Sequence, residues 1–346
     1  MSTADSTAVQ GGLSPAGGGG QTEPAAAAGL GPWALALRRL KRNRPALVFG
    51  ALFIVLVALA LAAPLWAQVA GTTPVRNHLS DTVVVDGRTE QVVSFDGVPI
   101  APTWQEKFFL GADNNGRDVA VRLLYGARNS LFIGITASLI TVFLAVALGM
   151  LAGYLRGWTD AVIARSLDVI WAFPVLLLGV ALGVSLALGG LKIGPLEIQG
   201  GSLWIPTLII GVVSVVYLAR PIRGQALSLR EKEFVEAARA QGAGPIRIMF
   251  SELLPNVAST ILVFFPLIVA NAILLEAALS FLGAGVQPPQ PSWGTMLADG
   301  VVLLSTSPHL TIVPGLMLVL TVLALNVFGD GVRDALDPRA KIRFEH

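Results

Sequence analysis

The sequence predicts an all-α membrane protein that crosses the bilayer six times, with both termini in the cytoplasm. The composition, six apolar runs and the distribution of basic residues predict this class. Of the 346 residues, 54% are hydrophobic and only 13% are charged, and the mean hydropathy is +0.70. Soluble domains carry about 25% charged residues, so this composition is typical of a chain that lies largely in lipid.

The first 45 residues are expected to form a disordered cytoplasmic tail that ends in a basic cluster. Residues 1–32 are mostly small or polar and show no periodicity, as in segments that cannot bury a core. Five basic residues then precede the first apolar run: Arg38, Arg39, Lys41, Arg42 and Arg44. That run, 46–68, begins too far along the chain and is too long for a signal peptide, so it predicts a retained transmembrane helix.

Five further apolar runs complete the predicted spans, and each approaches the roughly 20 residues that a helix needs to cross a bilayer. They lie at 129–155, 166–188, 203–222, 257–285 and 310–330. Residues 129–330 would then form one five-helix transmembrane domain, followed by a cytoplasmic tail at 331–346. Pro174 and Pro266 interrupt two of the spans, and we expect local kinks there.

Two pairs of glycines lie at helical i,i+4 spacing within the predicted spans. They are Gly149 with Gly153 and Gly179 with Gly183. Because small residues at this spacing let helix backbones approach closely in lipid, both pairs predict helix-packing sites.

The basic residues predict the orientation of the spans. Of the 24 lysines and arginines, 17 lie in the N-terminal tail, the loop at 155–165, the segment at 220–255 and the C-terminus. The remaining 7 lie on the opposite side, and 6 of these belong to the long segment 69–128, where charge has less influence on topology. The positive-inside rule therefore places both termini in the cytoplasm.

The extracytoplasmic segment 69–128 is not membrane-like. Residues 83–96 read as two short strands joined at Asp86-Gly87, a hairpin signal. This hairpin would either contact a docking protein or be a solvated decoration. Asp113 is a candidate cap for a following amphipathic stretch, which would form an interfacial helix that leads into the second span.

The polar segment 223–256 lies between two predicted spans on the cytoplasmic side. Within it, residues 233–241 (EFVEAARAQ) are strong helix formers, and Gly242 supplies the left-handed position that ends such a helix. A short exposed helix that carries Glu236-Ala237-Ala238 suits close docking into a groove on another protein. Leu254-Pro255 follows at the start of the next apolar run.

Glu276 lies within the fifth predicted span, and Ser280 lies on the same helical stripe at i+4. A carboxylate in a membrane is costly unless it is paired or faces water. Two interpretations remain open. In the first, Glu276 and Ser280 line or gate a pathway. In the second, Glu276 is a buried structural carboxylate that is bonded to a neighbouring span or subunit.

Several classes of function are excluded by what the sequence lacks. It contains no G-x-x-x-x-G-K-[ST] loop, no catalytic constellation and no metal-ligand spacing, and its three histidines are scattered. We therefore expect no enzyme activity, no cofactor and no metal, and ATP hydrolysis, if any, on another polypeptide. Basic residues do not gather with aromatic residues on a soluble face, which argues against nucleic-acid binding.

Residues 233–255 resemble the EAA loop, the segment of ABC importer permeases that docks on the ATPase subunits. Four further stretches resemble the C-type permease subunit of dipeptide and oligopeptide importers. They are LGADNNGRDVAVRLLYGARNSL (110–131), RSLDVIWAFPVLLLGVAL (165–182), LSFLGAGVQPPQPSWGTMLADG (279–300) and NVFGDGVRDALDPR (326–339). The insert at 72–106 falls outside the resemblance, and Glu252 stands where many such permeases have an aliphatic residue.

This resemblance implies a type I ABC importer in which the chain is one permease subunit. Its partners would be a second homologous permease, two cytoplasmic ATPase subunits and an extracytoplasmic substrate-binding protein. The coupling residues would be Glu236, Ala237, Ala238, Gly242, Leu254 and Pro255. Peptides are the expected substrate; nickel or another small solute is the alternative within this class. A secondary transporter is the alternative of another class, and it would need intramembrane ion-coupling groups beyond Glu276.

Overall fold

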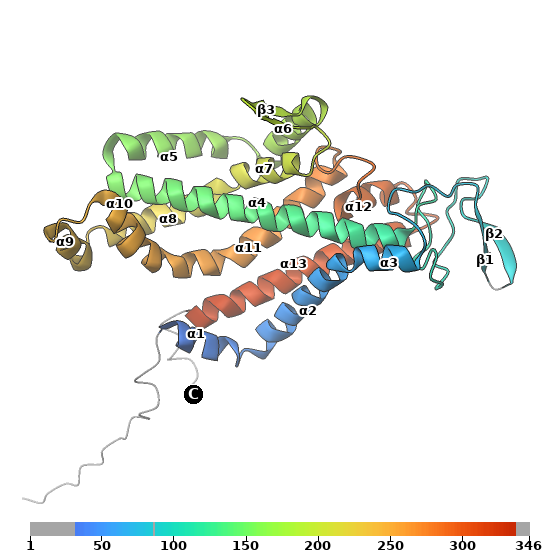
Figure 1. Cartoon of the computed structure of the whole chain (residues 1–346), viewed down its shortest axis with the longest axis horizontal. Coiled ribbons are helices and arrows are strands. Elements are labelled where there is room, and N and C mark those ends of the chain that lie inside the picture. Colours follow the sequence, from blue (N-terminus) through green and yellow to red (C-terminus); the bar gives the residue numbers. More distant parts are fainter. Residues whose placement is uncertain (1–31, 86, 337–346) are drawn as a thin grey trace, which may run out of the picture.

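The computed structural model describes residues 32–85 and 87–336, which form an elongated bundle of helices (Figure 1). The main helices run along the long axis of the molecule. One end carries α9, α10 and α1, and the opposite end carries α3, α12 and the hairpin β1–β2. We call these the α9 end and the hairpin end.

The element bounds in chain order are α1 Pro32–Leu40, α2 Arg44–Leu61, α3 Ala63–Val69, β1 Thr82–Val85, β2 Arg88–Gln91, α4 Val119–Leu155, α5 Gly157–Ala172, α6 Val175–Gly189, β3 Leu191–Ile193, β4 Leu196–Ile198, α7 Trp204–Val213, α8 Val215–Leu229, α9 Glu233–Ala240, α10 Pro245–Ile248, a π-helical turn Met249–Leu253, α11 Leu254–Phe281, α12 Trp293–Val301 and α13 His309–Leu336.

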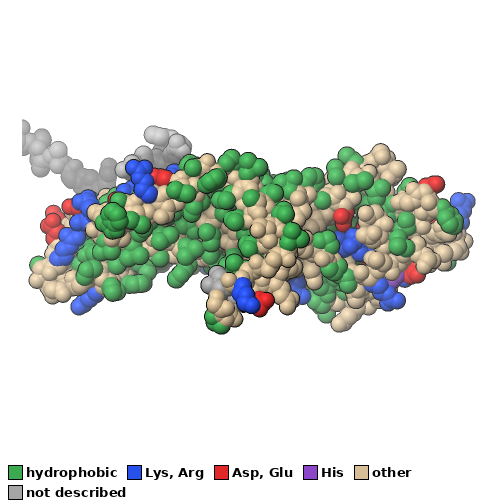
Figure 2. Space-filling view, turned by 90° about the horizontal axis from the view of Figure 1, so that it is seen from above, with side chains coloured by type: hydrophobic (Ala, Val, Ile, Leu, Met, Phe, Trp, Pro, Cys, Tyr) green, Lys and Arg blue, Asp and Glu red, His purple; other side chains and the backbone are tan. Residues whose placement is uncertain are grey.

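Five helical stretches of the described chain are long and apolar enough to cross a membrane. They are Arg44–Leu61, Val119–Leu155, Trp204–Leu229, Pro245–Phe281 and His309–Leu336. Hydrophobic side chains cover much of the middle of the molecule, and basic and acidic side chains lie at both ends (Figure 2). This is the pattern of a helical membrane protein with polar ends.

The third predicted span is not a single helix. Its residues fall into α5 and α6, which meet at an angle of 87° around Phe173 and Pro174. Proline cannot donate the backbone hydrogen bond that would continue α5, and it holds the preceding residue extended. The expected kink is therefore a sharp break, and the pair counts as a sixth span only if it crosses as one bent unit.

The first predicted span also ends early, since α2 stops at Leu61 and the short α3 follows after Ala62. The predicted disorder of residues 1–45 is wrong for its last part, because α1 forms a helix that contacts α13. Residues 1–31 of that tail lie outside the described residues, as do residues 337–346 of the predicted C-terminal tail.

The packing of α4 against α8 confirms the interpretation of the first glycine pair. A Cβ atom added to Gly149 would lie 2.8 Å from the carbonyl oxygen of Ala219, and one added to Gly153 would lie 2.5 Å from the Cβ of Ala226. Gly179 approaches Leu279 and Gly183 approaches the backbone of Ala284 in the same way. Larger residues at these positions would force the helices apart.

The segment between α3 and α4 folds around a small core of its own. Val92, Ile100, Phe108 and Ala112 are buried together there. The predicted hairpin is confirmed: β1 and β2 pair antiparallel, with Val85 opposite Arg88. A second hairpin, β3–β4, joins α6 to α7 and was not predicted.

Candidate functional site

The coupling segment begins with α9, whose sequence explains its bounds. Glu233 and Glu236 lie in the first turn and Arg239 lies in the last, which complements the helix dipole at both ends. Gly242 follows with φ of +83°, as predicted, because only glycine takes this left-handed conformation without strain. Val235 is completely buried and anchors the helix to the rest of the chain.

The predicted coupling residues differ in their exposure. Glu236 and Ala237 are exposed, whereas Ala238 is half-buried and packs against the core. Leu254 and Pro255 begin α11, with Leu254 half-buried and Pro255 exposed. Leu254 and Pro255 therefore start the next membrane helix. The small exposed side chain of Ala237 leaves room for another protein to approach α9 closely.

Three large apolar side chains at the α9 end are exposed, and they are not among the residues predicted from the sequence. Phe234 is 37% exposed, Ile246 is 71% exposed and Phe250 is 65% exposed. They lie on α9, α10 and the π-helical turn, which follow one another in contact. The sequence signal for such a surface was the presence of large apolar residues in an otherwise polar loop. Exposed apolar groups rimmed by polar ones typify a protein-docking surface.

Arginines connect the coupling segment to the membrane helices. Arg230 donates to the carbonyl oxygen of Tyr154, at the end of α4, at 2.5 Å. The guanidinium groups of Arg230 and Arg239 lie 5.9 Å and 5.5 Å from the centre of the Tyr154 ring. Arg156 also pairs with Glu231 at 3.1 Å. A displacement of α9 would therefore be carried to α4, the longest helix of the bundle.

Glu276 and Ser280 come together in the interior. Glu276 is completely buried, and the hydroxyl of Ser280 donates to its Oε1 at 2.6 Å. The Ser280 hydroxyl also accepts the backbone N–H of Val286 at 2.9 Å. The two side chains thus hold the loop after α11, and their burial supports the structural interpretation of Glu276 over the pathway interpretation.

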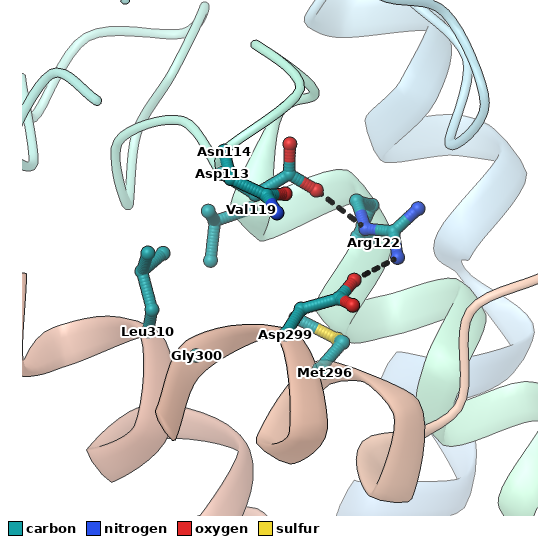
Figure 3. A pocket seen from close by; sticks show the side chains of 8 residues that line it. All are labelled: Asp113, Asn114, Val119, Arg122, Met296, Asp299, Gly300 and Leu310. Atoms are coloured by element: carbon teal, nitrogen blue, oxygen red, sulfur yellow. Dashed lines mark ion pairs between the residues drawn. The ribbon is translucent and has the colours of Figure 1, made fainter. Parts of the chain in front are cut away.

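A charged cluster joins the external segment to α4 and α12 at the hairpin end (Figure 3). Asp113 pairs with Arg117 at 2.7 Å and with Arg122 at 3.1 Å. Asp299 of α12 pairs with the same two arginines at 3.2 Å and 3.5 Å. Because both arginines and Asp113 are largely buried, removal of one partner would leave a buried charge unpaired.

The cluster corrects the predicted helix cap. Asp113 is occupied with arginines, and Asp118 caps α4 by accepting the backbone N–H of Val121 at 3.1 Å. Asp118 also accepts the N–H of Phe108 at 2.7 Å. Burial raises the pKa of Asp118 above its usual value, although these backbone bonds oppose the rise. The predicted helix that leads into the second span is confirmed, but it is not a separate interfacial helix, because residues 119–128 are the first turns of α4 itself.

Two known protein families match the sequence of this chain. Residues 145–342 match the model of the binding-protein-dependent transport system inner membrane component, and residues 31–79 match that of the N-terminal transmembrane domain of oligopeptide transport permease C. The first match alone covers more than half of the chain. The chain is a binding-protein-dependent transport permease. It is a multi-pass inner-membrane protein of the ABC transporter class.

Relatives of this permease carry names of the same kind. It is 36% identical over 310 residues to the glutathione transport system permease protein GsiD of Pectobacterium atrosepticum. The aligned residues make up 90% of this chain and 92% of that protein. It is 36% identical to the dipeptide transport system permease protein DppC of Alkalihalophilus pseudofirmus, over 90% and 91% of the two chains.

A solved structure shows the same fold. A chain of the inward-facing MetNI methionine ABC transporter has a TM-score of 0.50 and covers 62% of this permease and 96% of its own length. At 17% identity this likeness carries the fold alone. The resemblance expected from the sequence motifs is thereby confirmed at the level of the family.

Proposed function

We propose that this permease is one of two membrane subunits of an ATP-driven importer that moves peptides delivered by a substrate-binding protein. The exposed helix α9 is the observation that carries the proposal. It combines a left-handed glycine end, an exposed Ala237 and neighbouring exposed apolar side chains. Such a helix has no purpose in a transporter that is driven by an ion gradient alone.

The coupling roles of Glu236, Ala237, Ala238, Gly242, Leu254 and Pro255 belong to this proposal. Closure of two ATPase subunits would displace α9, and the contacts of Arg230 and Arg239 with Tyr154 would carry the displacement to α4. The permease then needs no chemistry of its own, since it converts movement into a switch between two helix packings. This agrees with the absence of any nucleotide-binding loop from its sequence.

Peptides are the proposed cargo because the named relatives transport a dipeptide in one case and glutathione, a tripeptide, in the other. Both relatives match along almost the whole of this permease.

The test is co-expression with the second permease, two ATPase subunits and the binding protein from the same organism. We expect a stable complex whose ATPase activity rises when the binding protein is loaded with peptide and which imports labelled peptide into vesicles. A permease that moves peptide without any ATPase partner would refute the proposal.

A further inference from the structure

The hairpin end also contains a cavity that is separate from the coupling segment and from the charged cluster. A cavity of about 550 Å³ opens between the outer ends of α2 and α4. Its lining comes from α2, from α4, from Leu203 before α7 and from Gln290 in the loop between α11 and α12. This volume lies within the range of small-molecule binding sites.

The α4 residues of the cavity form one stripe of the helix. Tyr125, Arg128, Asn129 and Phe132 follow the i, i+3, i+4, i+7 spacing that places side chains on a common face. Arg128 is exposed on this stripe, directly before the apolar run of the second span.

Arg128 differs from the two arginines of the charged cluster. Arg117 and Arg122 are paired with Asp113 and Asp299, whereas no described residue gives Arg128 a hydrogen bond or an ion pair. The described residues that line the cavity include no acidic side chain. An unneutralised cation at the edge of an apolar span is costly unless it serves a ligand or reaches a headgroup.

The loop with Gln290 is held over the cavity by the buried neighbours of Arg128. The Asn129 amide donates to the carbonyl oxygen of Pro291 at 2.7 Å, and the Ser130 hydroxyl accepts the N–H of Trp293 at 3.3 Å. These bonds fix Gln290 beside the helix stripe. The Gln290 amide and the Tyr125 hydroxyl have no side-chain hydrogen bond within the described chain, so both can donate toward a ligand beside Arg128.

The remaining lining is apolar. It consists of Val57, Ala60, Leu61, Leu131, Phe132, Ile135 and Leu203. A ligand that satisfies the whole cavity must therefore combine an oxyanion with an apolar body. A peptide C-terminus has this combination, because its carboxylate is ionised at neutral pH and its last side chain can be apolar.

We propose that this cavity, which we call the Arg128 pocket, binds the carboxylate of a substrate on its way through the outer half of the pathway. This inference rests on the proposed function and adds a chemical requirement to it: the cargo presents a free carboxylate. A phospholipid phosphate is the other source of the same chemistry, and the test separates the two.

The test uses the assembled transporter in detergent, and this chain has no cysteine of its own. Leu61→Cys places one thiol at the pocket without removing a proposed donor, since Leu61 is an apolar lining residue that is 70% exposed. Its rate of labelling by a maleimide reports occupancy without the binding protein. The probes are leucyl-leucine, its C-terminal amide, S-methylglutathione and the short-chain lipid dihexanoyl phosphatidylglycerol.

We expect leucyl-leucine or S-methylglutathione to slow the labelling, and the amide to need about 10-fold higher concentration, because a charge-assisted hydrogen bond is lost. Arg128→Met should remove this preference and Arg128→Lys should restore most of it. Two controls are Arg165→Met, which removes an exposed arginine of α5, and Ser228→Cys, whose labelling should not respond to peptide.

Three results would overturn the inference. Protection by the lipid and by neither peptide would make the pocket a headgroup site. Equal protection by the acid and the amide would remove the role of the carboxylate, and no protection would remove the site. The proposed function is tested separately by uptake. A complex that imports peptide but shows none of this protection would refute the inference alone, and an assembled complex that imports no peptide would refute the proposed function and the inference with it.

Discussion

Arg223 of α8 and Asp160 of α5 form a two-point ion pair at the α9 end. The Nε and one terminal nitrogen of the arginine donate to the two carboxylate oxygens at 2.5 Å and 2.7 Å. The side chains are 33% and 19% exposed, so water screens this pair less than a fully exposed one. It joins the bent α5–α6 pair to the helix that leads directly into α9.

Breaking this pair should weaken the coupling of ATP hydrolysis to transport. We expect Asp160→Asn to leave assembly and basal ATPase activity intact and to lower peptide uptake about 2- to 30-fold, as for coupling changes of about 0.5–2 kcal/mol. The pair Arg165–Asp168 is a control, since Arg165 is 86% exposed and its contact is 3.7 Å long. Equal losses of uptake in Asp160→Asn and Arg165→Met would count against a specific role.

Gly242 should be intolerant of a side chain although space is free around it. No atom lies within 4 Å of the Cβ that a substitution would add, but φ is +83°, which a β-branched residue resists at a cost of about 1–2 kcal/mol. We expect Gly242→Val to insert normally and to lose stimulated ATPase activity and uptake. Gly244 has the same open space at φ of −73°, so Gly244→Val is the matched control. Full activity of both variants would refute the role of the helix end.

Glu276 should behave as a structural carboxylate. Glu276→Gln keeps the size of the side chain and an oxygen that accepts from Ser280, so we expect uptake within about twofold of the parent. Glu276→Ala should lower the free energy of unfolding by about 2–4 kcal/mol, because it leaves a cavity and an unpaired hydroxyl. Thermal unfolding of the purified complex measures both. A stable Glu276→Gln complex without uptake would instead support the pathway interpretation.

We hypothesise that the predicted hairpin segment, residues 83–96, contacts the binding protein through two exposed apolar residues, one in β1 and one in the turn after β2. Val84 is 57% exposed and Phe95 is 97% exposed, whereas Val92 belongs to the small core and must be kept. The double variant Val84→Thr, Phe95→Ser should therefore fold normally and bind the loaded binding protein about 10-fold more weakly. If the affinity does not change, the hairpin is a solvated decoration.

Features that depend on only a few neighbouring residues were predicted well from the sequence. The end of α9 at Gly242, the turn of the first hairpin and the packing at Gly149 and Gly153 follow from backbone freedom and side-chain size alone. Choices among competing neighbours were not predictable in this way. Asp113 and Asp118 both suit a helix cap, but Arg117 and Arg122 occupy Asp113. Asp299 of α12 holds the same two arginines through a tertiary contact that the local sequence does not specify.

The same limit applies to the bend and to the site residues. Pro174 predicted a distortion, but the 87° angle depends on what α5 and α6 pack against. The second hairpin carried a visible Gly194-Pro195 turn signal that lay too close to apolar runs to stand out. Arg128 was part of a family-like stretch in the sequence, and only the fold shows it without a partner beside a cavity.

The orientation of the membrane helices is tested by two single cysteines. Asp96, in the external segment, and Ser228, near the α9 end, are both exposed. We expect an impermeant maleimide to label Asp96→Cys in intact cells and Ser228→Cys only after the cells are opened, since the basic residues place the α9 end in the cytoplasm. Labelling of both from outside would contradict this topology.

The central claim, that α9 docks on an ATPase subunit, is tested most directly by a cross-link from Ala237. In the otherwise cysteine-free chain, Ala237→Cys should form a disulfide with a cysteine placed in the facing groove of the co-purified ATPase. Val235→Cys is the control on the same helix, because Val235 is completely buried against the permease itself. The account predicts a cross-link from position 237 and none from position 235. An ATP-dependent complex that transports peptide yet gives no cross-link from any exposed position of α9 would contradict it.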